Sequence, residues 1–105
     1  MLHLIMPPSV TQLVVYLEPI NLRWGPDRIR TFCREEIGVE PDESTGFIFT
    51  NRKQDSLLMY YVAEDGDGVL QKKLDKGAFL MPAPDPEAKK WVRMKAEMMG
   101  RLFRA

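Results

Sequence analysis

The 105-residue sequence predicts an α+β domain built on a small, mostly antiparallel sheet. After residue 46, short runs of branched and aromatic residues recur between turns that contain Gly and Asp. An earlier segment repeats its apolar residues with helical spacing. The length suits one modest core. We therefore expect a first strand and a four-strand meander, packed by one helix and followed by a C-terminal helix.

The meander is expected between Gly46 and Pro82. Its runs are rich in residues that favour strands, and its connections contain glycines that permit sharp reversals. The first connection, 51–56, is polar and should project into water as a hairpin tip. Pro82 closes the sheet because it has no N–H to donate. The four predicted strands cover residues 47–49, 57–62, 69–74 and 78–81.

Before the meander, the continuous apolar run 13–17 predicts a strand buried on both faces. From Asp27 the apolar residues follow positions i, i+3, i+4 and i+8, which indicates a helix with one apolar face, and Gly38 ends it. The arginines of this segment lie off that face and should contact water or a partner. The apolar positions are Ile29, Phe32, Cys33 and Ile37.

The tail after the meander predicts a second helix. Asp85 suits an N-cap and Pro86 a first helical position. From residue 87 to residue 105, a broad apolar face alternates with many Lys and Arg residues. We therefore expect two parts, an α+β domain over 1–84 and a basic amphipathic helix over 85–105.

The formal charge is zero, with 15 basic and 15 acidic residues, so no overall field draws the chain to nucleic acid or to a membrane. The distribution is uneven. Residues 1–34 hold four basic and two acidic side chains, residues 35–67 hold two and nine, and residues 68–105 hold nine and four. A polarised surface is therefore one interpretation, and a mixed solvated surface is the other.

The sequence offers little for catalysis or metal binding. Cys33 and His3 are the only thiol and imidazole ligands, and no second His can activate a nucleophile. The acidic run 64–68 is no calcium loop, because Lys76 stands where the loop needs a bidentate Glu. We expect no enzyme, no metal and no cofactor. The single Cys, the absence of a secretory leader and the lack of a membrane span favour the cytoplasm.

A binding surface is the remaining candidate. Arginines near the helix, the polar hairpin tip and lysines of the third strand could contact phosphates. A solvated hairpin tip explains Arg52 and Lys53 equally well. The candidate contact residues are Arg23, Arg28, Arg30, Asn51, Arg52, Lys53, Lys72 and Lys73.

Four segments carry a resemblance to a known family. They are Val-Tyr-Leu at 15–17, Asn-Leu-Arg-Trp-Gly at 21–25, Gly-Phe-Ile-Phe-Thr-Asn-Arg at 46–52 and Lys-Lys-Leu-Asp-Lys-Gly-Ala-Phe-Leu-Met-Pro at 72–82. In this order, over 13–82, the chain resembles TnpB, the small transposase accessory protein of the insertion sequence 66 family. That family is unrelated to the RNA-guided nuclease of the same name.

The resemblance implies a non-enzymatic role in DNA transposition beside a large catalytic transposase. The family pattern implies contacts to DNA phosphates or to the transposase through Arg23, Asn51, Arg52, Lys72 and Lys73. DNA at the element ends and the transposase are the implied partners. The alternative is a protein adaptor that docks on the transposase, or self-associates, through its C-terminal helix. The chain departs from the family pattern at Asn21, Leu58, Ala63 and Lys73.

Overall fold

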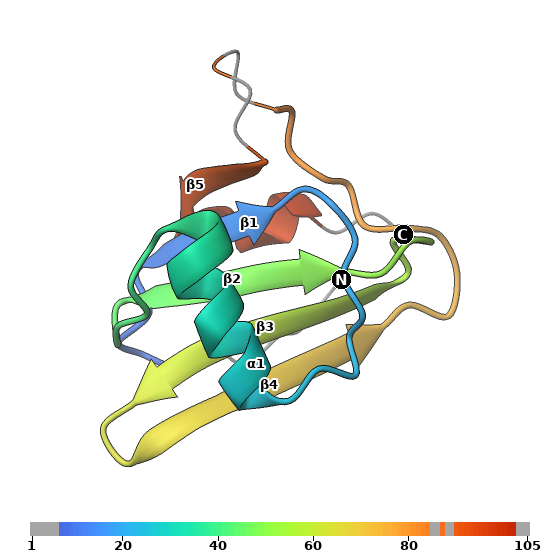
Figure 1. Ribbon diagram of the computed structural model, residues 1–105. Helices are drawn as coiled ribbons and strands as arrows, with labels where there is room; N and C mark the ends of the chain where they lie inside the picture. The colour runs from blue at the N-terminus through green and yellow to red at the C-terminus, as the bar shows by residue number, and fades with distance from the viewer. Residues whose placement is uncertain (1–6, 85–86, 88–89, 103–105) are drawn as a thin grey trace.

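The computed structural model describes residues 7–84, 87 and 90–102. They form a five-stranded sheet with the strand order β4-β3-β2-β1-β5, and a helical segment lies across one face (Figure 1). The expected α+β class, with one helix packed on a sheet, is confirmed. The strands are β1 (Gln12–Tyr16), β2 (Thr45–Thr50), β3 (Ser56–Ala63), β4 (Gly66–Lys73) and β5 (Trp91–Lys95).

The sheet is mixed. β1 and β2 run parallel, with Leu13 beside Gly46 and Val15 beside Ile48. The other three strand pairs are antiparallel. The prediction of a mostly antiparallel sheet is therefore wrong. The helical segment returns the chain to the end where β1 begins, so the next strand, placed beside β1, runs in the same direction.

The crossover between β1 and β2 is helical. It begins as α1 (Pro26–Phe32) and continues as one π-helical turn, η1 (Cys33–Ile37). The wide turn ends where the N–H groups of Gly38 and Val39 both donate to the Cys33 carbonyl, at 2.9 and 3.1 Å. Gly38 adopts a left-handed φ of 82°, which glycine accommodates without strain. The helix predicted to end at this glycine is confirmed.

One face of the sheet packs against this helix through what we call the helix-side cluster. Aromatic rings form its edge: the Phe32 ring lies 5.0 Å from the Tyr16 ring and 5.5 Å from the Trp24 ring, measured between centroids. The spacing of apolar residues along the helix therefore predicts the buried face correctly. The buried members are Val14, Tyr16, Ile29, Cys33, Ile37, Phe47, Phe49, Leu58 and Tyr60.

The opposite face is also apolar, and the segment after β4 helps to cover it. Phe79 is 2% exposed and packs in the apolar cluster on this face, which we call the opposite cluster, with Met81 beside it. The buried members of the opposite cluster are Val10, Leu13, Val15, Ile48, Leu57, Met59, Phe79, Ala96 and Met99. The N–H of Phe79 donates to the Gln54 carbonyl at 2.7 Å, but residues 78–81 form no strand. The predicted fourth strand of the meander is therefore wrong. Here the aromatic residue anchors an irregular segment instead of a ladder.

The expected C-terminal helix is also wrong. Trp91–Lys95 forms β5, which pairs antiparallel with β1, and only a 3-10 segment, η2 (Ala96–Leu102), follows it. Val92 and Met94 pack in the opposite cluster while Trp91 packs in the helix-side cluster, so the segment follows a period of two. β1 is buried on both faces and takes a strand partner on each side. The proposed N-cap Asp85 and Pro86 lie outside the described residues.

Within the described ranges, no helix has both the length and the apolar character needed to cross a membrane.

Candidate nucleic-acid interface

Three segments far apart in the sequence meet at one end of the sheet, which we call the hairpin end: residues 19–24, 50–56 and 71–74. Strands β1 and β2 finish here, β3 begins, and β4 finishes, because Ser56 pairs with Lys73 (Figure 1). The N–H of Ile20 donates to the Thr50 carbonyl at 3.0 Å, which joins the segment after β1 to the end of β2. The segments that resemble the transposition family therefore converge in space.

Asn51 organises the hairpin tip. Its side-chain oxygen accepts hydrogen bonds from the backbone N–H groups of Asp55 and Ser56, both at 3.1 Å. Its side-chain nitrogen donates to the Asp55 carboxylate at 2.6 Å. This hydrogen bond lowers the pKa of Asp55, and the charges of Lys73 and Lys53 lower it further. The amide of Asn51 is therefore occupied inside the protein, although the sequence suggests it as a contact residue.

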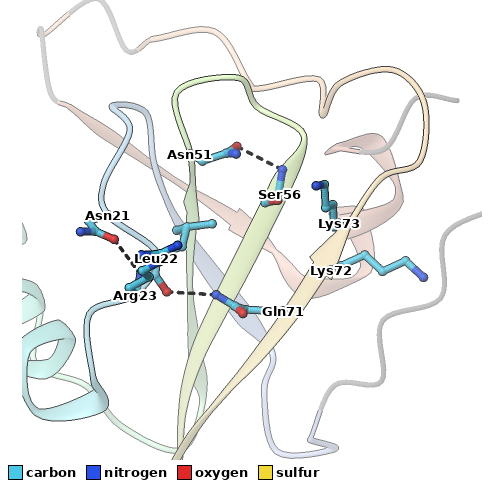
Figure 2. Close-up of a pocket in the computed structure, with 8 residues that line it drawn as sticks. All are labelled: Asn21, Leu22, Arg23, Asn51, Ser56, Gln71, Lys72 and Lys73. Carbon is cyan, nitrogen blue, oxygen red and sulfur yellow. Dashed lines mark hydrogen bonds between the residues drawn. The ribbon is translucent and has the colours of Figure 1, made fainter.

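A compact turn presents Arg23. The side-chain oxygen of Asn21 accepts the N–H of Arg23 at 2.9 Å, and the Asn21 carbonyl accepts the N–H of Trp24 at 3.1 Å. From β4, the side-chain nitrogen of Gln71 donates to the Leu22 carbonyl at 3.0 Å (Figure 2). The backbone of this turn is therefore fixed to the sheet, while the Arg23 side chain is exposed.

The turn, the hairpin and β4 enclose a hollow of about 540 Å³, which we call the basic hollow (Figure 2). Arg23 and Lys73 supply positive charge on the helix side of the sheet. Lys72 is different, because it pairs with Leu57, a member of the opposite cluster, and its side chain extends away from the others in Figure 2. The lining residues are Asn21, Leu22, Arg23, Asn51, Ser56, Gln71, Lys72 and Lys73.

A second hollow, of about 420 Å³, adjoins the first, and Asn21 lines both. We call it the aromatic hollow, since three rings line it and Arg52 completes the wall. The sequence predicts Tyr16 in a strand buried on both faces and Phe32 on the apolar face of the helix, but it assigns Trp24 to neither, and this hollow was not predicted. Only the adjacency of Trp24 to Arg23 could have indicated it. The lining residues are Tyr16, Pro19, Ile20, Asn21, Trp24, Phe32 and Arg52.

The two other predicted arginines lie on the helix. The Arg28 guanidinium lies over the Trp24 ring, 4.2 Å from its centroid, which is a cation–π contact beside the aromatic hollow. Arg30 is half-buried, and no acceptor among the described residues pairs with its buried Nε. Its charge acts on Tyr60, whose hydroxyl donates to Asp67 at 2.6 Å. Arg30 therefore faces the middle of the sheet and lines neither hollow.

The cations at the hairpin end form no direct ion pair among the described residues, although the Asp55 carboxylate lies close enough to Lys53 and Lys73 for their charges to lower its pKa. Arg23, Arg52, Lys53 and Lys73 are exposed, and none forms an ion pair within the described ranges. Arg34 differs from them, because its guanidinium contacts the Glu40 carboxylate at 2.9 Å. Exposed, unpaired cations can contact phosphates without first breaking an internal ion pair. The structure thus brings four of the eight predicted site residues together as exposed cations.

Other chemistry has few candidates. Over residues 7–84, 87 and 90–102, no group of three or more His, Cys, Asp or Glu side chains is placed to hold a metal ion. Cys33 is fully buried on the inner face of the helix, and burial raises the pKa of its thiol to about 12. A thiol with this pKa stays protonated at neutral pH and is a poor nucleophile.

Comparison with known proteins points to one family. The family model described as IS66 Orf2-like protein matches residues 11–105. Searches of curated proteins and of solved structures found no match. The matched range includes every strand of the sheet and both hollows. The chain belongs to the IS66 Orf2-like family of transposition-associated accessory proteins.

Proposed function

We propose that this protein assists transposition without chemistry of its own, by holding the phosphate backbone of the element's DNA at the hairpin end. The main observation in favour is that Arg23, Arg52 and Lys73, from three distant segments, lie exposed around adjoining hollows and form no ion pair over the part of the chain that the structure describes. Lys53 extends this surface at the hairpin tip. Arginine and lysine contacts of this kind give sequence-independent affinity for DNA.

The turn geometry supports the proposal as well. The backbone of each segment is fixed by internal hydrogen bonds, from Asn51 in the hairpin and from Gln71 to the 21–23 turn. These polar groups hold the frame, and the cations remain available. A preorganised frame lowers the entropy lost when a surface binds its partner.

The test is DNA binding by a triple variant, Arg23→Ala, Arg52→Ala and Lys73→Ala. Affinity for DNA with the element's terminal sequence should fall by about 10- to 100-fold at moderate salt. The slope of log affinity against log salt should become shallower by about two to three, since each lost phosphate contact removes roughly 0.9 from it. Fluorescence anisotropy over a salt series measures both quantities.

A matched control removes two arginines and one lysine elsewhere: Arg34→Ala, Arg93→Ala and Lys95→Ala, all exposed. This variant should bind as the wild type does. Equal affinity and equal salt slope for the wild type and the hairpin-end variant would contradict the proposal.

The adaptor alternative now concerns a strand and not a helix. β5 is the last strand of the sheet beyond β1. Since the Ala96 N–H and the Lys90 carbonyl bond inward to β1, the alternation of a strand directs the Arg93 N–H outward. An outward edge can pair with a strand of another chain. If the transposase docks there, Arg93→Pro should weaken the complex while Arg93→Ala leaves it intact; equal binding of both would exclude this mode.

A further inference from the structure

Phosphate contacts alone do not explain the aromatic hollow. Five of its seven lining residues are aromatic or aliphatic, yet it opens next to the cations of the basic hollow. Trp24 and Phe32 are only half-buried, although both belong to the edge of the helix-side cluster. Two aromatic residues are thus partly exposed beside a surface that attracts phosphates.

The rings are held in a fixed arrangement. Phe32 contacts Tyr16 edge-on at 5.0 Å and Trp24 at 5.5 Å, and the Arg28 guanidinium lies against the Trp24 ring. Trp24 is further held by its backbone bond to Asn21. A wall of locked rings needs little reordering when a planar ligand binds.

We propose that the aromatic hollow takes one unpaired nucleobase of single-stranded DNA, while Arg23, Arg52 and Lys73 hold the phosphates on either side of it. This inference rests on the proposed function and deepens it by naming the DNA as unpaired. Proteins that bind single strands combine a positive groove with aromatic side chains on which bases stack. The volume of about 420 Å³ falls within the range of small-molecule sites.

Charge complementarity favours a nucleotide over an aromatic side chain of another protein. Arg52 lines the hollow itself, Arg28 lies on Trp24, and Arg23 and Lys73 stand in the adjoining hollow. A nucleotide brings one negative charge for each base, so filling the hollow also neutralises neighbouring cations. A neutral ring from a protein would leave these charges unpaired. A base in intact duplex is stacked on both faces and must leave the stack to enter.

The direct test changes the DNA and leaves the protein as it is. A fluorescent single strand is compared with a strand of equal length and charge in which several central nucleotides are abasic. The wild-type protein should bind the intact strand about 10- to 100-fold more tightly, the effect expected for one stacked base. The salt slopes of the two strands should be equal, since their phosphates are equal.

Two tryptophans provide a matched pair of variants. Trp24→Leu should bind the intact and abasic strands equally. Trp91→Leu should retain the preference, because Trp91 is also half-buried in the helix-side cluster and also has an arginine over its ring, Arg93 at 5.9 Å, but does not line the hollow. In a Trp91→Phe protein, the emission of Trp24 should be quenched by the intact strand and unchanged by the abasic strand. This readout stands even if Trp24→Leu does not fold.

The outcomes separate the two proposals. Equal binding of both strands, with a steep salt slope and loss of binding in the hairpin-end triple variant, would overturn the base site and leave the phosphate surface standing. Quenching of Trp24 by the transposase in the absence of DNA would assign the hollow to a protein and overturn the base site too. No binding of either single strand would overturn the base site, and no binding of the element's terminal DNA would overturn the phosphate surface.

Discussion

The two ends of the sheet carry opposite charge. At the hairpin end, Arg23, Arg52 and Lys73 are exposed and form no ion pair with any residue that the structure describes. At the other end, where β2 begins and the β3–β4 turn lies, the exposed charges are mainly carboxylates, and we call it the acidic end: residues 42–45 and 63–67 (Figure 1). Its exposed carboxylates are those of Asp42, Glu43, Glu64 and Asp65.

A chain with zero net charge can therefore present a strongly basic surface. β3, with eight residues at about 3.3 Å each, extends over roughly 25 Å and separates the two ends. This exceeds the screening length of about 8 Å at physiological salt, so each end acts almost independently of the other. The charge distribution is therefore polarised along the direction of the strands. The net charge of the chain alone says little about what either end can bind.

Reversing charge at the hairpin end should have the largest effect. Arg23→Glu, Arg52→Glu and Lys73→Glu together should lower affinity for DNA by more than about 100-fold, because each substitution replaces attraction to a phosphate with repulsion. Anisotropy titrations measure the affinity, and circular dichroism checks that the sheet is intact. If the folded triple variant retained wild-type affinity, the claim that the hairpin end binds DNA and the acidic end does not would be contradicted.

The second prediction compares the turn residues that hold each end. Asn51→Ala removes three hydrogen bonds from a half-buried side chain and should lower the free energy of unfolding by about 2 kcal/mol. Asp42→Ala removes two from an exposed side chain, those from the N–H and hydroxyl of Ser44, and should cost about 1 kcal/mol or less. Urea unfolding measures both. A larger loss for Asp42→Ala would show that the hairpin end is the less rigid of the two.

The third prediction concerns pH. The folded pKa of Asp55 is lowered by the hydrogen bond from Asn51 and by the charges of Lys73 and Lys53. The stabilisation from ionised Asp55 is therefore fully present above the unfolded pKa of about 3.9. It is lost as the pH falls through the lower pKa of Asp55 in the folded state. The stability advantage of the wild type over Asp55→Asn should stay constant from pH 7 to about 5 and shrink below about pH 4.

The same pH series separates the two ends. The pKa of Asp42 is also lowered, chiefly by the Ser44 hydroxyl, with no lysine contributing. Added salt should therefore reduce the lowering of the Asp55 pKa, and with it the pH dependence of stability from this residue, and should leave the contribution of Asp42 nearly unchanged. Thermal unfolding across the pH series at two salt concentrations measures this difference. Parallel curves for the wild type and Asp55→Asn from pH 7 to 2 would contradict the assignment.

The smallest effect is expected at the acidic end. Glu64→Gln with Asp65→Asn removes two exposed carboxylates but should change affinity for DNA less than about twofold at 0.15 M salt, because the distance exceeds the screening length. At low salt the effect should grow. A tenfold gain at 0.15 M would mean that DNA reaches both ends.

The sequence predicts the helix well because a single periodicity dominates it. Ile29, Cys33 and Ile37 recur on one face, all three are buried, and Gly38 provides the left-handed residue that ends the segment. The β2–β3 hairpin is equally local, since its turn residues and apolar runs adjoin. These elements depend on contacts between neighbours in the chain, which periodicity can report.

β5 could not be predicted in this way. The segment from Trp91 to Lys95 contains both apolar and basic residues, which suit an amphipathic helix and an alternating strand alike. Pairing with β1, almost 80 residues earlier in the sequence, selects the strand, because the edge of β1 that does not pair with β2 pairs with this segment. The direction of β2 relative to β1 is also a tertiary property. A single sequence does not report which distant strand supplies a partner.

The candidate site could be predicted from the sequence in part, less well than the helix and better than β5. Arg23, Arg52, Lys53 and Lys73 are predicted and do gather at the hairpin end, because the motifs that contain them lie at the ends of strands. Lys72 faces the opposite side, since alternation along β4 separates neighbours. The aromatic hollow was not predicted, because the apolar patterns place Tyr16 and Phe32 in the core whether they are half or fully buried, and Trp24 belongs to no such pattern.

One measurement tests the central claim most directly: a ¹⁵N heteronuclear correlation spectrum recorded while a single-stranded DNA is added. The account predicts shifts in the amides of residues 19–24, 50–56 and 71–74 and in the indole N–H of Trp24, with residues 42–45 and 63–67 unmoved. Shifts centred on the acidic end or on β5, or a spectrum that DNA leaves unchanged, would contradict it.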